Sequence, residues 1–192
     1  MTNIPISAAL PTGFSATPDH ICLTIGAAST PVSLAFEYFT GQIFGTEADA
    51  HNFMLTKPAT AKPAIGEEPL DIVLNGDSWV YIGFHELLNM RFSDVVPAFD
   101  LKKFPALRYG GIMHYDPAGQ GSVTPIPDCV YARFAVKVKP PVGTTQYHDL
   151  VDYNIDLIQN VSIGGAPSTG RLPVIFDPGV RYPGAQLIPH PI

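Results

Sequence analysis

Charged residues are scarce in this chain of 192 residues. Asp, Glu, Lys and Arg make up 15% of it, against about a quarter in an average globular protein. The 17 acidic residues outnumber the 11 basic ones, the formal net charge is −6, and no basic stripe is present. The composition argues against binding to nucleic acid or to an anionic membrane surface. It also predicts large neutral surface areas, which favours contact with a protein partner or a second copy of the chain.

Long hydrophobic runs are also missing. No stretch of about 18 apolar residues is present, so the sequence predicts no membrane insertion. The first twenty residues lack a basic segment followed by a continuous apolar one, so we expect no secretory signal. The compartment stays open, with the cytoplasm as the default.

Cysteine occurs only twice, as Cys22 and Cys129. Each lies in an apolar, strand-like run, so two buried free thiols are expected. A disulfide between two strands is the alternative, and the sequence does not decide between them. The immunoglobulin pattern does not fit, because Pro127 rather than a tyrosine precedes Cys129 by two residues and Trp79 lies far from Cys22.

Recognisable catalytic motifs are absent. The chain has no Gly-x-Ser-x-Gly turn, and its glycine pairs lack the Lys-Ser/Thr context of a phosphate-binding loop. The segment from His85 resembles the zinc-protease helix motif, but Asn89 stands where the second histidine is needed. No cofactor is expected from these patterns.

Proline and glycine are abundant, with 20 and 17 residues. They separate short runs in which apolar and polar residues alternate, a pattern typical of all-β proteins with many short strands. The length suits one such domain over residues 1–192. We expect an antiparallel β-sandwich, a jelly roll or another Greek key, with one or two short helical turns between residues 85 and 104.

Strands are expected at Asp19–Ala27, Val32–Phe39, Leu70–Leu74, Ser78–Phe84, Leu107–Tyr115, Val130–Lys139, Tyr153–Ile163 and Arg171–Phe176. Asn75-Gly76 lies between two of them and predicts a tight hairpin, because both turn residues need a positive φ. Alternation along 130–139 places Arg133 on a face predicted to be wet.

Three segments are weakly patterned. The N-terminal residues 1–18 and the C-terminal residues 178–192 are rich in proline and are expected to be extended. Residues 45–69 are expected to form a long loop, which is uncommon in a compact domain unless it is functional or packs on a neighbour.

Candidate site residues come from loop tips and scattered histidines. The stretch from His114 to Gly121 predicts a tight turn with a flexible tip, and such tips carry recognition on β scaffolds. Tyrosines near loops can stack on sugar rings. The ligand-binding candidates are therefore His114, Tyr115, Asp116 and Tyr147. A divalent metal would be held by His85, Glu86 and His114, because strands far apart in sequence can supply its ligands.

Three functions remain in view. The first is a non-enzymatic β-sandwich that self-assembles or binds a protein partner, supported by the low charge and the arm-like segments. The second is a module that binds carbohydrate or another small ligand. The third is a metal-assisted enzyme.

Overall fold

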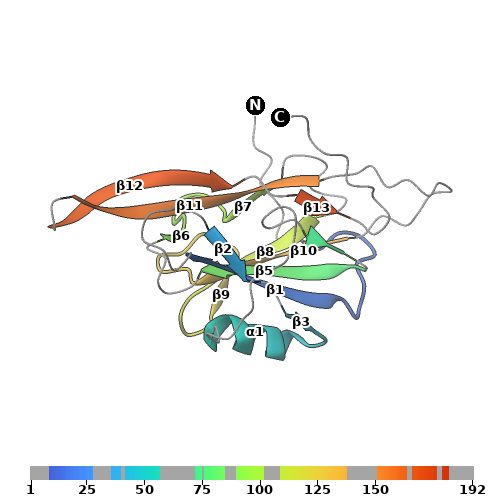
Figure 1. The fold of residues 1–192 in the computed structure, drawn as a ribbon. Helices are drawn as coiled ribbons and strands as arrows, with labels where there is room; N and C mark the ends of the chain where they lie inside the picture. Colours follow the sequence, from blue (N-terminus) through green and yellow to red (C-terminus); the bar gives the residue numbers. More distant parts are fainter. Residues whose placement is uncertain are drawn as a thin grey trace.

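The computed structural model is rich in strands, and its described part holds thirteen strands and one helix (Figure 1). The described residues are 9–27, 36–39, 42–56, 72–74, 76–84, 90–101, 109–137, 151–163, 166–176 and 179–181. This composition of elements confirms the expectation of a predominantly β protein.

Two sheets contain all of the described strands. The first sheet is formed by β1 (Asp19–Ala27), β2 (Phe36–Phe39), β3 (Ile43–Phe44), β5 (Ser78–Phe84), β8 (Tyr109–Tyr115), β9 (Gly121–Ser122) and β10 (Tyr131–Val136). The second is formed by β4 (Ile72–Val73), β6 (Met90–Phe92), β7 (Phe99–Leu101), β11 (Val151–Ile163), β12 (Ala166–Phe176) and β13 (Gly179–Arg181). The sequence pattern located β1 and β5 to the residue.

The first sheet has the strand order β2-β1-β5-β10-β8-β9, with β3 also paired to β1. Most pairings are antiparallel, as expected, but the central strands β1 and β5 run parallel, with Asp19 opposite Ser78. β4 and β13 in the second sheet also run parallel, so these two pairings depart from the antiparallel expectation. Parallel strands need a crossover connection rather than a tight turn, and between β1 and β5 the chain contains β2, β3, α1 and β4.

The hairpin predicted at Asn75-Gly76 does not form. β4 pairs with β13 in the second sheet, whereas β5 lies in the first sheet between β1 and β10. Asn75, the first residue of the predicted turn, is outside the described residues. The chain therefore passes from the second sheet to the first between β4 and β5.

The helix also differs from its predicted place. Residues 90–92 and 99–101 are strands rather than helical turns, and residues 85–89 and 102–108 lie outside the described part. The helix α1 spans Glu47–Thr56, inside the segment predicted to be a loop. It begins after Thr46, whose hydroxyl accepts a hydrogen bond from the Asp49 amide at 3.2 Å, the geometry of an N-cap.

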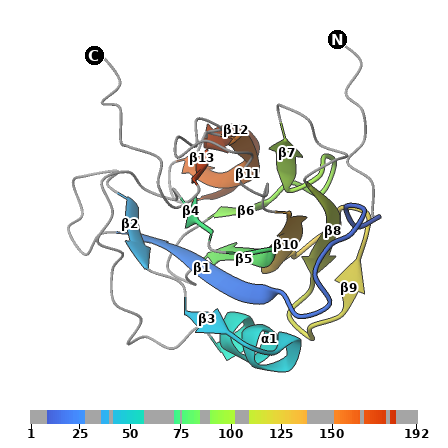
Figure 2. The same cartoon turned by 90° about the vertical axis from the view of Figure 1, so that its right-hand side faces the viewer.

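Both faces of the first sheet are covered. α1 lies on one face, and β11, β12 and β13 lie on the other (Figures 1 and 2). Phenylalanines link the two sheets: the rings of Phe84 and Phe92 lie 4.8 Å apart, and those of Phe99 and Phe134 lie 4.7 Å apart. This coverage buries every residue of β10, so Arg133, which we placed on a wet face, is only 8% exposed.

The described part of the N-terminal segment packs on the first sheet. The carbonyl of Ala9 accepts a hydrogen bond from the Gly111 amide at 3.2 Å, and Phe14 meets Trp79 edge to face at 5.6 Å. Lys137 donates a hydrogen bond to the carbonyl of Thr12. The predicted C-terminal extension contains β13, and residues 182–192 lie outside the described part.

β11 and β12 form a long hairpin. β13, β7 and β6 pair in turn with β11, up to Gln159. Beyond Gln159, the residues 160–163 of β11 and 166–171 of β12 pair only with each other among the described strands. This end of the hairpin is therefore a two-stranded ribbon, and we call it the distal ribbon.

Candidate functional site

A group of polar and aromatic side chains gathers on the face of the first sheet that α1 covers. We call it the Arg133 cluster. The sheet contributes His20, Trp79, Tyr81, Met113, Tyr115, Tyr131 and Arg133, and the helix contributes Glu47 and His51. For a chain with so few charges, this concentration makes the cluster the leading candidate site.

Strand register brings these side chains together. Tyr81 of β5, Arg133 of β10 and Met113 of β8 lie opposite one another across three strands. Tyr131 and Tyr115 form the next row along. Because alternate residues of a strand share a face, both rows point toward α1.

Arg133 is the centre of the cluster. Its Nη1 donates hydrogen bonds to Glu47 Oε1 at 2.5 Å and to the Tyr81 hydroxyl at 3.1 Å. Its guanidinium carbon lies 4.2 Å from the centroid of the Trp79 ring, a cation–π contact. The buried positive charge is therefore balanced by one carboxylate and one aromatic face.

The helix contributes a second set of hydrogen bonds. His51 Nε2 lies 3.1 Å from Glu47 Oε1, one helical turn earlier, and His51 Nδ1 lies 2.5 Å from the Tyr131 hydroxyl. A neutral His51 protonated at Nε2 satisfies both contacts, because it donates to the carboxylate and accepts from the phenol. Glu47 thus joins the helix to the sheet through Arg133.

A similar chain of hydrogen bonds extends to β1. The Tyr81 hydroxyl accepts from Arg133 and lies 3.0 Å from His20 Nδ1, so it donates its own proton to that nitrogen. Burial lowers the pKa of His20; the charge of Glu47 opposes this shift, and the charge of Arg133 adds to it. His20 is therefore a neutral acceptor at neutral pH.

The other titratable groups also hold one protonation state. Burial raises the pKa of Tyr115 to about 12 and raises the pKa values of Tyr81 and Tyr131, so the three phenols stay neutral. Burial alone would raise the pKa of Glu47, but the hydrogen bond from His51 and the charge of Arg133 lower it below its ordinary value. At neutral pH the cluster contains a guanidinium and a carboxylate in contact.

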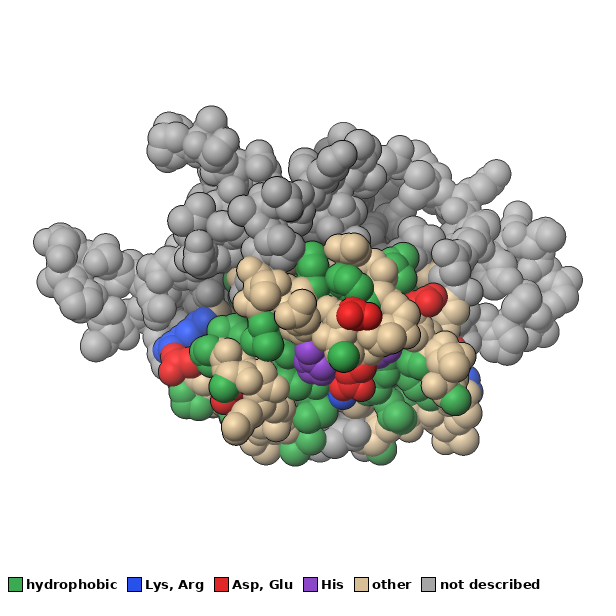
Figure 3. All heavy atoms as spheres, turned by 90° about the horizontal axis from the view of Figure 1, so that it is seen from below, with side chains coloured by type: hydrophobic (Ala, Val, Ile, Leu, Met, Phe, Trp, Pro, Cys, Tyr) green, Lys and Arg blue, Asp and Glu red, His purple; other side chains and the backbone are tan. Residues whose placement is uncertain are grey.

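The cluster reaches the molecular surface beside the helix. The side chain of Glu47 is 52% exposed and that of His51 is 22% exposed, whereas that of Arg133 is 9% exposed. On this face, histidine and acidic side chains adjoin among hydrophobic ones (Figure 3). The phenols of the cluster stay protonated, so they are hydrogen-bond donors rather than nucleophiles.

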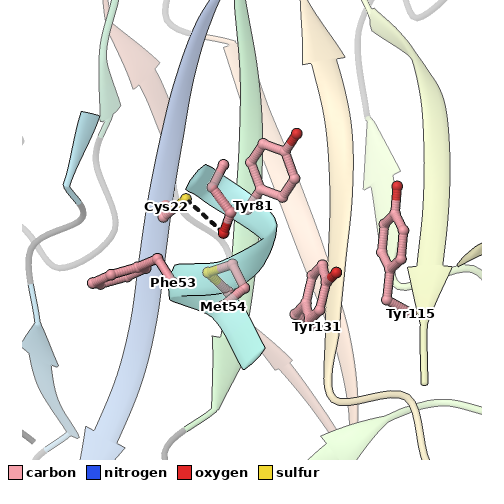
Figure 4. Close-up of a cluster of buried hydrophobic side chains, with 7 residues drawn as sticks. Cys22, Phe53, Met54, Tyr81, Tyr115 and Tyr131 are labelled. Atoms are coloured by element: carbon pink, nitrogen blue, oxygen red, sulfur yellow. Dashed lines mark hydrogen bonds between the residues drawn. The ribbon is translucent and has the colours of Figure 1, made fainter. Parts of the chain in front are cut away.

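An apolar cluster lies between the helix and the sheet. Phe53 and Met54 of α1 pack beside Cys22, and the tyrosines of three neighbouring strands continue the cluster (Figure 4). The Cys22 thiol lies 3.8 Å from the carbonyl of Ala50, and burial raises its pKa. Cys22 and Cys129 are both buried and do not form a disulfide with each other, in agreement with the expectation of two buried thiols.

The structure places His114 away from the Arg133 cluster, on the opposite face of the sheet. It is fully buried and both ring nitrogens are engaged. Nε2 accepts a hydrogen bond from the Ala98 amide at 3.1 Å, and Nδ1 lies 3.3 Å from the carbonyl of Ser122. His114 therefore joins the β6–β7 loop to β9.

Tyr115 and Asp116 follow His114 in sequence but do not share a site with it. Tyr115 points to the α1 side, is 4% exposed, and stacks on Tyr131 at 4.6 Å. The Asp116 carboxylate accepts hydrogen bonds from the amides of Ala118 and Gln120, at 2.9 and 2.8 Å, and so orders its own turn.

The remaining predicted site residues, His85, Glu86 and Tyr147, lie outside the described part of the chain. Within the part that the structure describes, no group of three His, Cys, Asp or Glu side chains is arranged to hold a metal ion. His114, the described member of the predicted metal set, uses its nitrogens as stated above.

Sequence reasoning missed Arg133, Glu47 and His51. Arg133 was misplaced because alternation shows that two faces differ but not that a helix covers the polar one. The helix had its own signal: Thr46 is followed three residues later by Asp49, a capping pattern. The buried Ala50, Phe53 and Met54 then follow at helical spacing.

No protein-family model matches this chain, and no curated protein is significantly similar to it in sequence. No helix in the described part of the chain has the length and hydrophobicity that a membrane span requires.

Proposed function

We propose that this protein is a non-enzymatic β-sandwich that assembles with further copies of itself. The distal ribbon of β11 and β12 is the observation that carries the proposal. A two-stranded hairpin alone is only marginally stable in water. A ribbon that extends past its sheet therefore gains stability when it packs on a second surface, and a neighbouring copy supplies one.

Exposed apolar side chains give the proposal further support. Val95 is 76% exposed, Val96 is 44% exposed and Val123 is 57% exposed. The hydrogen bonds of His114 to Ala98 and Ser122 hold the two segments that carry these valines beside each other. Single apolar residues are common on monomers, but exposed apolar residues on neighbouring segments favour a contact surface.

The sandwich part of the proposal depends on the packing between the two sheets. Phe92 of β6 and Phe99 of β7 lie against Phe84 and Phe134 of the first sheet. Aromatic packing between two sheets is the usual core of a sandwich. The parallel pairing of β1 with β5 favours a mixed topology over a jelly roll.

The other two functions have less support. A carbohydrate site built on Tyr115 needs an exposed ring, and Tyr115 is 4% exposed. A metal enzyme built on His114 needs a free ring nitrogen, and both nitrogens of His114 have partners.

The test is the mass in solution, measured by light scattering on a sizing column over a concentration series. In a shortened variant, residues 161–170 are replaced by Asn-Gly, which joins the paired residues Asn160 and Arg171 by a tight turn. We expect the full chain to form an oligomer and the shortened chain to be a monomer.

The cooperative unfolding of the shortened chain in urea is the control, because it shows that the body of the protein remains folded. A full chain with the mass of one copy at every concentration would overturn the proposal. So would a folded, shortened chain that keeps the mass of the full-length oligomer.

A further inference from the structure

The Arg133 guanidinium has oxygen acceptors for its hydrogen bonds on one side but not on the other. Nη1 donates to Glu47 and Tyr81, as described above. On the opposite edge, Nε has no hydrogen-bond partner among the described residues, and Nη2 contacts the sulfur of Met113 at 3.7 Å. Arg133 is only 8% exposed. A buried donor without an oxygen acceptor is costly, and in a native structure it calls for an explanation.

A second donor also points at the same sulfur. The Tyr115 hydroxyl lies 3.8 Å from Met113 Sδ. A thioether is a weak acceptor, yet a guanidinium N–H and a phenol O–H both converge on it. An oxygen acceptor at this position would form stronger hydrogen bonds with both groups, and a second oxygen beside it would reach Nε.

We infer that this edge of Arg133 binds a small monocarboxylate. One carboxylate oxygen accepts from Nε, and the other accepts from Nη2 and the Tyr115 hydroxyl. The fork of a guanidinium edge matches the spacing of two carboxylate oxygens. The Trp79 ring on the guanidinium face holds the fork in place.

Met113 is suited to move aside for such a ligand. Its side chain is unbranched and flexible, and it is only half-buried. It lies at the edge of the sheet beside the exposed Gly121, where a Cβ atom would stand 2.7 Å from the Met113 methyl carbon. The absence of a side chain at Gly121 therefore leaves the room that Met113 occupies.

The charges around Arg133 favour a singly charged ligand. Glu47 already neutralises the guanidinium from the other edge. His20 adds no positive charge at neutral pH, because burial lowers its pKa. A phosphate dianion would bring two negative charges close to Glu47, whereas a monocarboxylate brings one.

The fluorescence of Trp79 provides the measurement, because Trp79 is the single tryptophan of the chain and stacks on Arg133. The folded protein is titrated at pH 7.5 and constant ionic strength with acetate, acetamide or inorganic phosphate. We expect a saturable change with acetate, at a dissociation constant on the order of millimolar, as for a ligand of four heavy atoms. Acetamide should give none, and phosphate should bind more weakly than acetate.

Three variants locate the site. Arg133→Lys keeps the charge but loses the fork, and should weaken acetate binding by about tenfold or more. Arg91→Lys is the matched control, because Arg91 Nε also lacks a partner within the described part of the chain, but Arg91 forms an ion pair with Asp128 on another part of the surface. It should leave the titration unchanged. Met113→Leu removes the competing sulfur at nearly constant volume and should tighten acetate binding severalfold.

Several results would overturn the inference. One is the absence of a saturable response to acetate in both the unaltered protein and the Met113→Leu variant. Another is an equal response to acetamide, because a neutral amide lacks the charge that the site requires. Phosphate binding tighter than that of acetate would contradict the monocarboxylate, and loss of binding in Arg91→Lys would contradict the location. The Met113→Leu arm keeps the test decisive if Arg133→Lys fails to fold.

Discussion

Gly111 shows how a single residue positions the Arg133 cluster. Met113 lies opposite Arg133 and Gly110 lies opposite Ala135, so two residues of β8 lie opposite Phe134. Gly111 has φ 62°, and glycine in this conformation is typical of a β-bulge. The bulge shifts the alternation along β8, so Tyr109 packs on Phe134 while Met113 and Tyr115 point toward α1.

Gly111→Ala should destabilise the protein by about 2 to 4 kcal/mol. The new residue would be strained at positive φ, and its Cβ would lie 2.7 Å from Cη2 of Trp79. Urea unfolding measures the loss, and Trp79 fluorescence reports displacement of the ring. Gly45→Ala is the control, because nothing lies within 4 Å of the added atom. Equal stabilities of the two variants would contradict this account of the bulge.

Two buried histidines make stability depend on pH. Burial lowers the pKa of His20 and of His114 below the ordinary value of 6.5. In the unfolded chain the two histidines are therefore protonated near pH 6.5, whereas in the folded chain they are protonated only at a lower pH. We expect the two histidines not to reduce the free energy of unfolding above about pH 7. We expect that free energy to fall as the pH drops below 6.5. Glu47, whose pKa is lowered, contributes a separate loss only below its ordinary value of 4.5.

Urea unfolding at pH 7.5, 6.5 and 5.5 measures this dependence. His20→Asn keeps an acceptor near Nδ1 but cannot be protonated in this range, so its stability should change less with pH than that of the unaltered protein. A variant with the same pH dependence as the unaltered protein would show that His20 does not contribute.

At the scale of single elements, α1 depends on its first turn. The Thr46 hydroxyl accepts from the Asp49 amide and donates to the Asp49 carboxylate at 2.6 Å. Loss of this cap releases the turn that carries Glu47, and with it the ion pair to Arg133. The start of a short helix such as α1 is determined by a few polar contacts rather than by a long hydrophobic stripe.

Thr46→Ala should lower the free energy of unfolding by about 1 kcal/mol. Thr56→Ala, at the other end of the same helix, is the matched control. The Thr56 hydroxyl donates back to the carbonyl of Asn52 at 2.8 Å and caps no amide, so its loss should change stability by less than about 0.5 kcal/mol. Chemical denaturation followed by circular dichroism compares the two, and a larger loss at Thr56 would reverse our assignment of the cap.

Strand positions were predictable where alternation was strong, as for β1 and β5. Strand partners were not, because pairing depends on contacts between distant parts of the chain. Asn75-Gly76 illustrates the limit: the dipeptide permits a tight turn, but β4 gains its partner in the second sheet instead. The strands β6 and β7 were missed because three residues are too few to show a period.

For the molecule as a whole, the predominance of strands followed from composition and alternation. The candidate site did not, because Arg133 acquires its surroundings only when α1 folds onto the sheet. No pattern within β10 distinguishes a polar face in water from a polar face beneath a helix. The low charge of the chain was the informative signal. Charged residues are seldom buried, so a buried charge in a chain with few of them indicates a structural or functional role.

The parallel pairing of β1 with β5 has a consequence for how the chain folds. The two strands at the centre of the first sheet are separated in the chain by β2, β3, α1 and β4, so their contacts close a long loop. Loop closure must precede the gain from pairing, and proteins dominated by such distant contacts fold slowly. A growing chain on the ribosome exposes β1 long before β5 is made, and β5 gains its second neighbour only when β10 follows. The edges that await β5 and β10 are thus exposed to other chains until β10 is made, and chaperones that bind extended apolar segments would act in this interval.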